Sequence, residues 1–248
     1  MINFKKQFGL WRSVAIYYWK PFNRRRLKKF YQQFIKPGDL CFDLGAHLGN
    51  RADAWLHLGG KVVAVEPQPH CMSYMRRRFR NRSNITFVEK ALGAEAGKTM
   101  MHISHMTPTV STLSGEKWRE IIDEDTSFKV NWEESIEVEM MTFDQLIDAY
   151  GVPAFCKLDV ENYELEVLKG LSQPIPAISV EYYPATPEQA VACIDILDKL
   201  GPYSYNWSLG ESQRLQSSDW VTSDEMKNFF RKMTRKDSYG DFYARLMD

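Results

Sequence analysis

The sequence predicts an α/β protein with a Rossmann-like, mostly parallel sheet that carries helices on both faces. Two patterns predict it. A strand, a glycine-containing turn, a helix and a second strand follow one another between Leu40 and Val65, and helical and strand patterns then alternate along the rest of the chain. The composition, 248 residues of which 44% are hydrophobic and 26% charged, is that of an ordinary globular protein.

The first unit sets the direction of the sheet. We expect a strand at 40–42, a turn at 45–49, a helix at 50–58 and a second strand at 62–65. In such a βαβ unit the two strands are parallel and the crossover is right-handed. The carboxyl ends of the strands therefore meet at one edge of the sheet, where ligands bind in open α/β folds.

The later elements continue the alternation. Helices are expected at 72–79, 143–150, 163–171, 187–200 and 223–232. Strands are expected at 85–89, 100–103, 136–140, 155–159, 177–181, 203–207 and 242–245. We expect residues 1–37 to be a basic amphipathic helical extension and 38–248 to be one cofactor-binding domain. Residues 105–135 should be a lid or an insertion, because long irregular loops usually have such a role.

The charges are unevenly distributed along the chain. The net charge is zero, yet residues 1–38 hold ten Lys or Arg and no Asp or Glu. Such a segment suits an anionic membrane surface, a nucleic acid, a second copy in an oligomer, or simply a solvated helix face. A nucleic-acid partner is not expected, because a helix with adjacent arginines such as Arg76–Arg78 more often presents a solvated face.

The apolar run nearest the N-terminus, Val14–Trp19, is too short for a membrane span or a secretory signal. The expected compartment is the cytoplasm, with peripheral membrane contact through residues 1–37 as an open alternative. The four cysteines lie far apart without a C-x-x-C pair, so reduced structural thiols are expected.

The turn between the first strand and the first helix predicts the cofactor. Glu66 ends the second strand, where a carboxylate can accept hydrogen bonds from both hydroxyls of a ribose. A dinucleotide site would have glycine in place of His47 and no negative charge at Asp43. S-adenosylmethionine fits better, because Asp43 can pair with its ammonium group. Gly45 and Gly49 permit close approach of the backbone. An NAD-linked oxidoreductase is therefore disfavoured.

Five sequence blocks resemble those of FkbM-type class I methyltransferases: Asp43–Asn50, Val65–Pro69, Ala91–Gly93, Lys157–Glu164 and Leu168–Leu171. The resemblance implies a seven-stranded sheet, S-adenosylmethionine as methyl donor and S-adenosylhomocysteine as product. It also implies O-methylation of a hydroxyl on a sugar, glycoconjugate or secondary metabolite by a methyltransferase domain at 38–248. Two positions depart from the family pattern: His47 stands where Asn is common, and Asn162 stands where glycine usually follows Asp-Val-Glu.

The expected cofactor-binding residues lie at strand ends. They are Asp43, Gly45, Ala46, His47, Gly49, Asn50, Glu66, Pro67, Glu89, Lys90, Ala91 and Asp159. The resemblance places Glu89, Lys90 and Ala91 beside the adenine, whereas spacing alone makes Glu89 and Lys90 ordinary strand-end charges.

Four side chains are candidates for catalysis. Asp159 and Glu161 follow a strand that should lie beside the strand carrying Asp43, so Asp159 is expected to face the cofactor and Glu161 the acceptor. Methyl transfer to a hydroxyl needs in-line positioning and a proton acceptor. Glu161 is the first candidate, ahead of Glu181 and His105. Two alternatives stay open: Glu161 caps the following helix, or the carboxylates hold a divalent ion, for which no ligand spacing gives support.

A different class of function also fits the sequence. A non-catalytic adapter could keep the cofactor fold and bind an anionic partner through its basic N-terminal arm. The joint presence of Asp43, Gly45, Gly49 and Glu66 argues against it, because a degenerate site need not retain all four.

Overall fold

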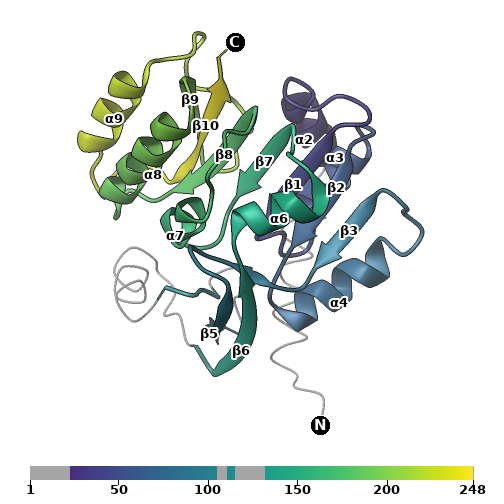
Figure 1. Ribbon diagram of the computed structural model, residues 1–248. Helices are drawn as coiled ribbons and strands as arrows, with labels where there is room; N and C mark the ends of the chain where they lie inside the picture. The colour runs from purple at the N-terminus through teal and green to yellow at the C-terminus, as the bar shows by residue number, and fades with distance from the viewer. Residues whose placement is uncertain (1–22, 105–110, 115–131, 248) are drawn as a thin grey trace.

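The computed structural model describes residues 23–104, 111–114 and 132–247. The main sheet consists of β1 (Leu40–Leu44), β2 (Lys61–Val65), β3 (Ile85–Val88), β7 (Phe155–Leu158), β8 (Ala177–Tyr182), β9 (Tyr203–Leu209) and β10 (Gly240–Leu246). Their order is β3-β2-β1-β7-β8-β10-β9 (Figure 1). Every neighbouring pair is parallel except those made by β10, which runs antiparallel to β8 and β9. The predicted mostly parallel, seven-stranded sheet is confirmed.

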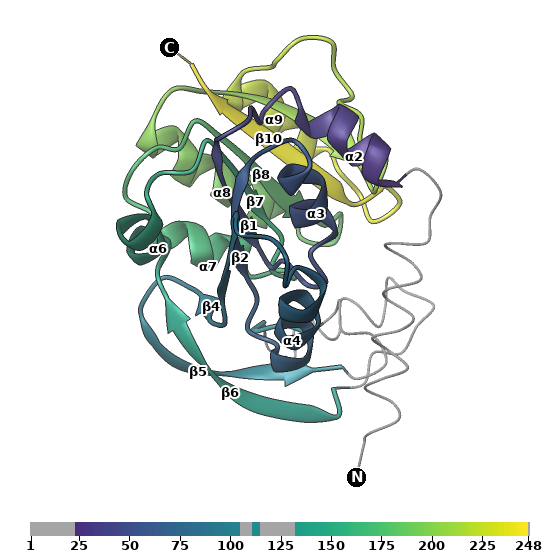
Figure 2. The same cartoon turned by 90° about the vertical axis from the view of Figure 1, so that its right-hand side faces the viewer.

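Helices cover both faces of this sheet, as Figure 2 shows in an edge-on view. One face carries α2 (Asn23–Tyr31), α3 (Asn50–Leu56) and α4 (Pro69–Arg78). The other carries α6 (Phe143–Tyr150), α7 (Glu164–Lys169), α8 (Pro187–Leu200) and α9 (Ser223–Arg231). Local sequence explains where several of these helices begin. Proline occupies the first turn of α4 and α8, and a capping box with threonine as the N-cap residue precedes α6 and α9.

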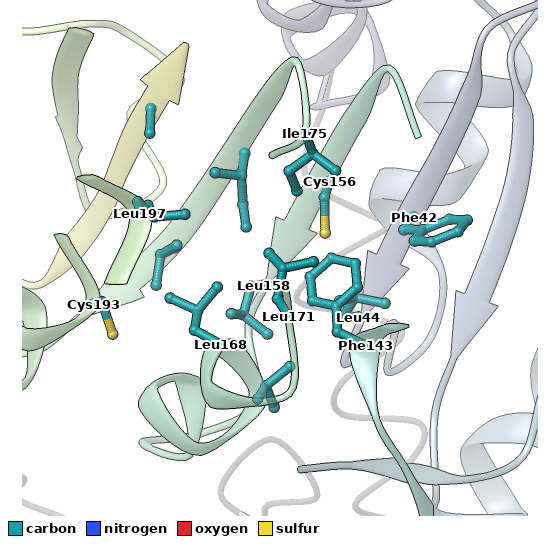
Figure 3. Packing of buried hydrophobic residues seen from close by; sticks show 14 of the residues in the cluster. Phe42, Leu44, Phe143, Cys156, Leu158, Leu168, Leu171, Ile175, Cys193 and Leu197 are labelled. Atoms are coloured by element: carbon teal, nitrogen blue, oxygen red, sulfur yellow. The ribbon is translucent and has the colours of Figure 1, made fainter. Parts of the chain in front are cut away.

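The central strands are buried on both faces, which is why they are near-continuous apolar runs in the sequence. Alternate side chains of β1 enter different cores: Phe42 and Leu44 pack toward α6 and α7, while Cys41 packs toward α3. Figure 3 shows the first of these cores, where the ring centroids of Phe42 and Phe143 are 6.2 Å apart. The four cysteines are buried and free, as expected.

A second, three-stranded sheet was not predicted. It has the order β4-β6-β5 and consists of β4 (Ala91–Leu92), β5 (Gly97–Ile103) and β6 (Glu134–Met141). The expected strands at 100–103 and 136–140 are thus real, but they pair antiparallel with each other outside the main sheet. Ile103 at the end of β5 pairs with Glu134 at the start of β6. The two ends of the expected lid or insertion are therefore attached to neighbouring positions of the small sheet. Most of it lies outside the described residues, and its role stays a prediction.

The described part of the N-terminal segment packs against the main sheet. Tyr31 is fully buried, and its ring lies 5.3 Å from that of Trp55 and 5.5 Å from that of Phe155. The arginines of α2 lie on its exposed side. Residues 1–22 of the expected helical extension lie outside the described residues. The boundary at residue 37, the cytoplasmic location, and contact of this segment with a membrane or a second copy stay predictions. Among the described residues, no helix is long and apolar enough to cross a membrane.

Candidate active site

A cavity lies at the carboxyl ends of β1, β2 and β7, with the small sheet and residues 111–113 on its opposite side. Its volume is about 770 Å³ including the open mouth. Its wall consists of Gly45, Ala46, His47, Asn50, Arg51, Val65, Glu66, Pro67, Gln68, Lys90, Ala91, Leu92, Met101, Ser111, Thr112, Leu113, Asp159, Val160 and Glu161. Most of the predicted cofactor residues are in this wall; Asp43, Gly49 and Glu89 are not.

The turn after β1 is shaped by close packing of the chain on itself. Gly45 has φ +82°, and a Cβ there would collide with the main-chain carbonyl oxygen of Asp159. Gly49 has φ +75°, and a Cβ would approach the ring of Phe79 at 2.8 Å. These two glycines therefore allow close packing of the turn against the segment after β7 and the end of α4, and the expectation that they also permit close approach of the cofactor stays a prediction. His47 also lies in the left-handed region, at φ 48°, a conformation that Asn tolerates well.

Glu66 is held so that its carboxylate faces the cavity. Its two oxygens accept the backbone N–H groups of His47 and Gln68, each at 2.9 Å. Burial raises the pKa of Glu66 to about 7 despite these hydrogen bonds. A carboxylate oxygen has more than one acceptor position, so both oxygens remain able to accept ribose hydroxyls.

Asp43 lies behind the cavity wall. Its Oδ2 accepts the backbone N–H of Ala52 at 3.2 Å, which fixes the start of α3. Burial raises the pKa of Asp43 to about 6, against the opposing effect of Arg51 and Lys157. The arrangement makes Asp43 a support of the turn, and of the two aspartates it is Asp159 that lines the wall.

The predicted adenine residues divide into two groups. Lys90 and Ala91 line the cavity. Glu89 is exposed and lies 3.6 Å from Arg76, away from the wall, as its spacing alone had suggested. His105 lies outside the described residues.

A buried lysine organises the charges between β7 and β10. Nζ of Lys157 donates to Asp159 at 3.0 Å and to Asp241 at 2.7 Å. Burial alone would raise the pKa of Asp159, but Lys157 and Arg51 outweigh it and hold the pKa below its ordinary value. Asp159 is therefore an anion on the wall of the cavity.

Glu161 and Glu181 share protons through Tyr183. The hydroxyl of Tyr183 lies 3.0 Å from Oε2 of Glu161 and 2.7 Å from Oε2 of Glu181. A phenol carries only one hydrogen, so the second short contact needs a proton from one of the carboxyl groups. Burial, and then the negative charge of Asp159, raise the pKa of both glutamates well above the ordinary value.

The backbone at Glu161 and Asn162 is strained. Both residues lie in the left-handed region, with φ 55° and 67°, which costs a residue other than glycine on the order of 1–2 kcal/mol. The departure at Asn162 therefore keeps the geometry that glycine would adopt, since Asn tolerates this region. Two hydroxyls hold the turn: Thr112 donates to the carbonyl of Glu161 at 2.7 Å, and Ser114 to that of Asn162 at 2.8 Å.

The structure tests the helix-cap alternative for Glu161. The side chain of Glu161 bonds to Tyr183, and α7 has no side-chain cap at its N-cap residue, Tyr163. Glu164 accepts the N–H of Val160 instead. Glu161 is thus directed to the cavity.

Asp159, Glu161 and Glu181 each offer an oxygen within 4.8 Å of the others, a separation that could accommodate a divalent ion. The same carboxylates already have partners in Lys157 and Tyr183. Ligand spacing along the sequence did not indicate this cluster, because Glu181 comes from a different strand.

Several residues of the cavity wall were not predicted from the sequence. Arg51, Gln68, Met101 and the segment 111–113 were not among the candidate site residues. Arg51 follows the glycine turn directly and carries a charge next to a predicted site, which was an available signal. The wall positions of Thr112 and Met101 depend on the unpredicted small sheet.

The family model of the FkbM methyltransferase domain matches residues 43–230. The chain belongs to this family. The match spans the glycine turn, Glu66 and the Asp159–Glu161 segment, so the residues that form the cavity are those of a methyltransferase domain. This FkbM-family protein is an S-adenosylmethionine-dependent methyltransferase, and S-adenosylmethionine is its cofactor.

Solved structures with a similar fold include three methyltransferases. A precorrin-6y C5,15-methyltransferase from Geobacter metallireducens has a TM-score of 0.48 and 10% identity, covering 90% of this chain and 87% of the other. An S-adenosylmethionine-dependent O-methyltransferase from Thermotoga maritima has a TM-score of 0.39 and 14% identity, and the match covers 92% of this chain and 66% of the other. An rRNA methylase from Streptococcus thermophilus has a TM-score of 0.41 and 10% identity, and the match covers 89% of this chain and 94% of the other. No curated protein matches the sequence.

Proposed function

We propose that this FkbM-family protein methylates a hydroxyl group of a sugar, glycoconjugate or other small secondary metabolite, and that Glu161 accepts the hydroxyl proton. The observation that carries the proposal is the partly buried carboxylate of Glu161 in the cavity wall, beside the anionic Asp159. Ser111 and Thr112 on the same wall add hydroxyl groups that suit a polar acceptor.

The cofactor, when bound, supplies a methyl group on a cationic sulfonium. The residues that would hold it are Glu66 at the ribose, Lys90 and Ala91 at the adenine, and the turn Gly45–His47 with Asp159 at the amino-acid end. Their fit rests on the cavity itself: Glu66 presents both oxygens into it, and Asp159 adds a negative charge that suits an ammonium or a sulfonium.

The proton of the acceptor has a defined route. Ionised Glu161 takes it from the hydroxyl oxygen as the methyl group is transferred. Tyr183 and Glu181 then offer neighbouring positions over which the proton can be shared. Thr112 holds the strained turn at Glu161 through the backbone carbonyl, which restricts the positions open to the carboxylate and so supports a role that depends on orientation.

The acceptor class is tested by incubating the protein with S-adenosylmethionine carrying a labelled methyl group and a panel of hydroxyl, amine and thiol acceptors. We expect the label in a methyl ether, identified by NMR. Label found only in N-methyl or S-methyl products would contradict O-methylation.

Replacement of the proposed base gives the first prediction. Glu161→Gln should lower kcat by about 10²–10⁴-fold, the usual contribution of a general base, and leave the cofactor Kd nearly unchanged. Because the pKa of Glu161 is raised, its ionised form is gained as pH increases, so the wild-type rate should rise with pH through that elevated pKa. The variant should lose this rise.

The matched control is Glu166→Gln, an i,i+3 partner of Lys169 on α7, which should retain both rate and pH profile. Full activity of Glu161→Gln would exclude Glu161 as the base. Loss of activity after chelation, restored by a divalent ion, would instead assign the three carboxylates to a metal.

A further inference from the structure

Arg51 is a cation in the cavity wall for which the cofactor site described above gives no role. It lies in the first turn of α3, and its side chain is 12% exposed. Its Nη2 is 3.2 Å from Oε1 of Glu211 and 3.6 Å from Oδ2 of Asp159. Its Nε–H is buried and has no hydrogen-bond partner among the described residues. A buried, unpaired donor is costly, which points to an acceptor supplied by a ligand.

Glu211 reaches Arg51 from a tight turn that follows β9. Gly210 and Gln213 on either side of it have positive φ, 46° and 52°. Nε2 of Gln213 donates to Oε2 of Glu211 at 3.0 Å, and Nη2 of Arg26 donates to its carbonyl oxygen at 2.9 Å. The carboxylate of Glu211 is therefore positioned, although it remains 37% exposed.

The geometry of the Arg51 guanidinium determines how a second carboxylate can bind to it. Nε and Nη2 form one edge with two parallel N–H donors, and a carboxylate binds such an edge with both oxygens. In the structure Nη2 is engaged by Glu211, while Nε is unpaired. Nη2 carries two hydrogens, but a second carboxylate on this edge would bring two anions to the same nitrogen, so we expect it to compete with Glu211 for Nη2.

Arg51 and Asp159 together present opposite charges side by side on one wall. This pair is complementary to the carboxylate and ammonium of an α-amino acid. We propose that Arg51 binds the carboxylate of the methionyl end of S-adenosylmethionine, and that Glu211 competes with the cofactor for this guanidinium. The inference rests on the placement of the cofactor in this cavity, and it makes the turn at 210–213 a determinant of cofactor affinity.

The test compares two ligands that differ by the amino-acid group. Calorimetric titration of S-adenosylhomocysteine and of methylthioadenosine, which lacks that group, is carried out on the wild type and on Arg51→Lys, Glu211→Gln and Glu137→Gln. The last is a control, since Glu137 is an exposed carboxylate paired with Lys98 on the small sheet. The folded state of each variant is verified by urea unfolding.

We expect Arg51→Lys to weaken S-adenosylhomocysteine binding by about tenfold, because lysine keeps the charge but lacks the planar pair of donors. Its affinity for methylthioadenosine should stay within about twofold of the wild type. Glu211→Gln should strengthen S-adenosylhomocysteine binding by several-fold and leave methylthioadenosine unchanged. Glu137→Gln should affect neither.

Equal loss of both ligands in Arg51→Lys, or unchanged S-adenosylhomocysteine affinity, would overturn the role of Arg51. Weaker S-adenosylhomocysteine binding by Glu211→Gln would overturn the competition and make Glu211 an orienting partner. Binding of neither ligand by the wild type would refute the placement of the cofactor, and this proposal with it. An unselective Arg51→Lys alone would leave that placement intact.

Discussion

The two halves of the cavity are built in different ways. The proposed cofactor half comes from short stretches next to each other in the sequence: the turn after β1 and the end of β2, joined by backbone hydrogen bonds to Glu66. The proposed acceptor half joins Glu161 and Thr112 of the wall with Tyr183, from three distant segments around a strained turn. The first half is set by main-chain geometry and the second by side chains that hold one another.

The turn at Gly45 joins the two halves, and its replacement should have the largest effect. In Gly45→Ala the new Cβ would collide with the carbonyl of Asp159 in addition to the cost of positive φ. We expect the free energy of unfolding to fall by about 3–5 kcal/mol in urea titrations.

Gly97→Ala is the control for this substitution, because no atom lies near the position of its added Cβ. It should change the free energy of unfolding by less than about 1 kcal/mol. A normal stability of Gly45→Ala would show that β7 can move away from the turn, and the two halves would then be less tightly joined than the structure indicates.

Glu66 tests the cofactor half alone. Glu66→Ala should weaken S-adenosylhomocysteine binding by roughly 1.5–3 kcal/mol, because charge-assisted bonds to the ribose hydroxyls are lost. Glu89→Ala is the matched comparison, since Glu89 is exposed and outside the wall. Calorimetry should find its affinity unchanged. An equal effect of the two substitutions would remove Glu66 from its proposed place at the ribose.

Asn162 tests the acceptor half with the smallest change. Asn162→Ala should lower the free energy of unfolding by about 1–2 kcal/mol, because alanine tolerates positive φ poorly, and should lower kcat by displacing Glu161. Asn162→Gly should stay near the wild type in both measurements. If glycine were as harmful as alanine, the hydrogen bond from Thr186 to the Asn162 side chain, and not the backbone, would hold the turn.

The same contrast explains what could be predicted from the sequence. The cofactor half was predictable because glycine spacing, strand ends and Glu66 lie within one βαβ unit, where local pattern determines position. Glu161 could be found as a candidate because it follows a buried strand. Its partner Tyr183 and the hydroxyl of Thr112 could not be assigned, because those contacts depend on how β8 and the small sheet are placed. The small sheet escaped prediction since β4 is only two residues long.

The position of β10 has a consequence for how the molecule acquires its active form. β8 and β9 do not pair with each other; β10 lies between them and carries Asp241, a partner of the fully buried Lys157. A chain in which β10 has not yet inserted therefore has an open sheet, and its Lys157 lacks one of its two counter-charges. Insertion of β10 thus closes the sheet and supplies the second counter-charge of Lys157 at once, so we expect the two to be coupled in folding.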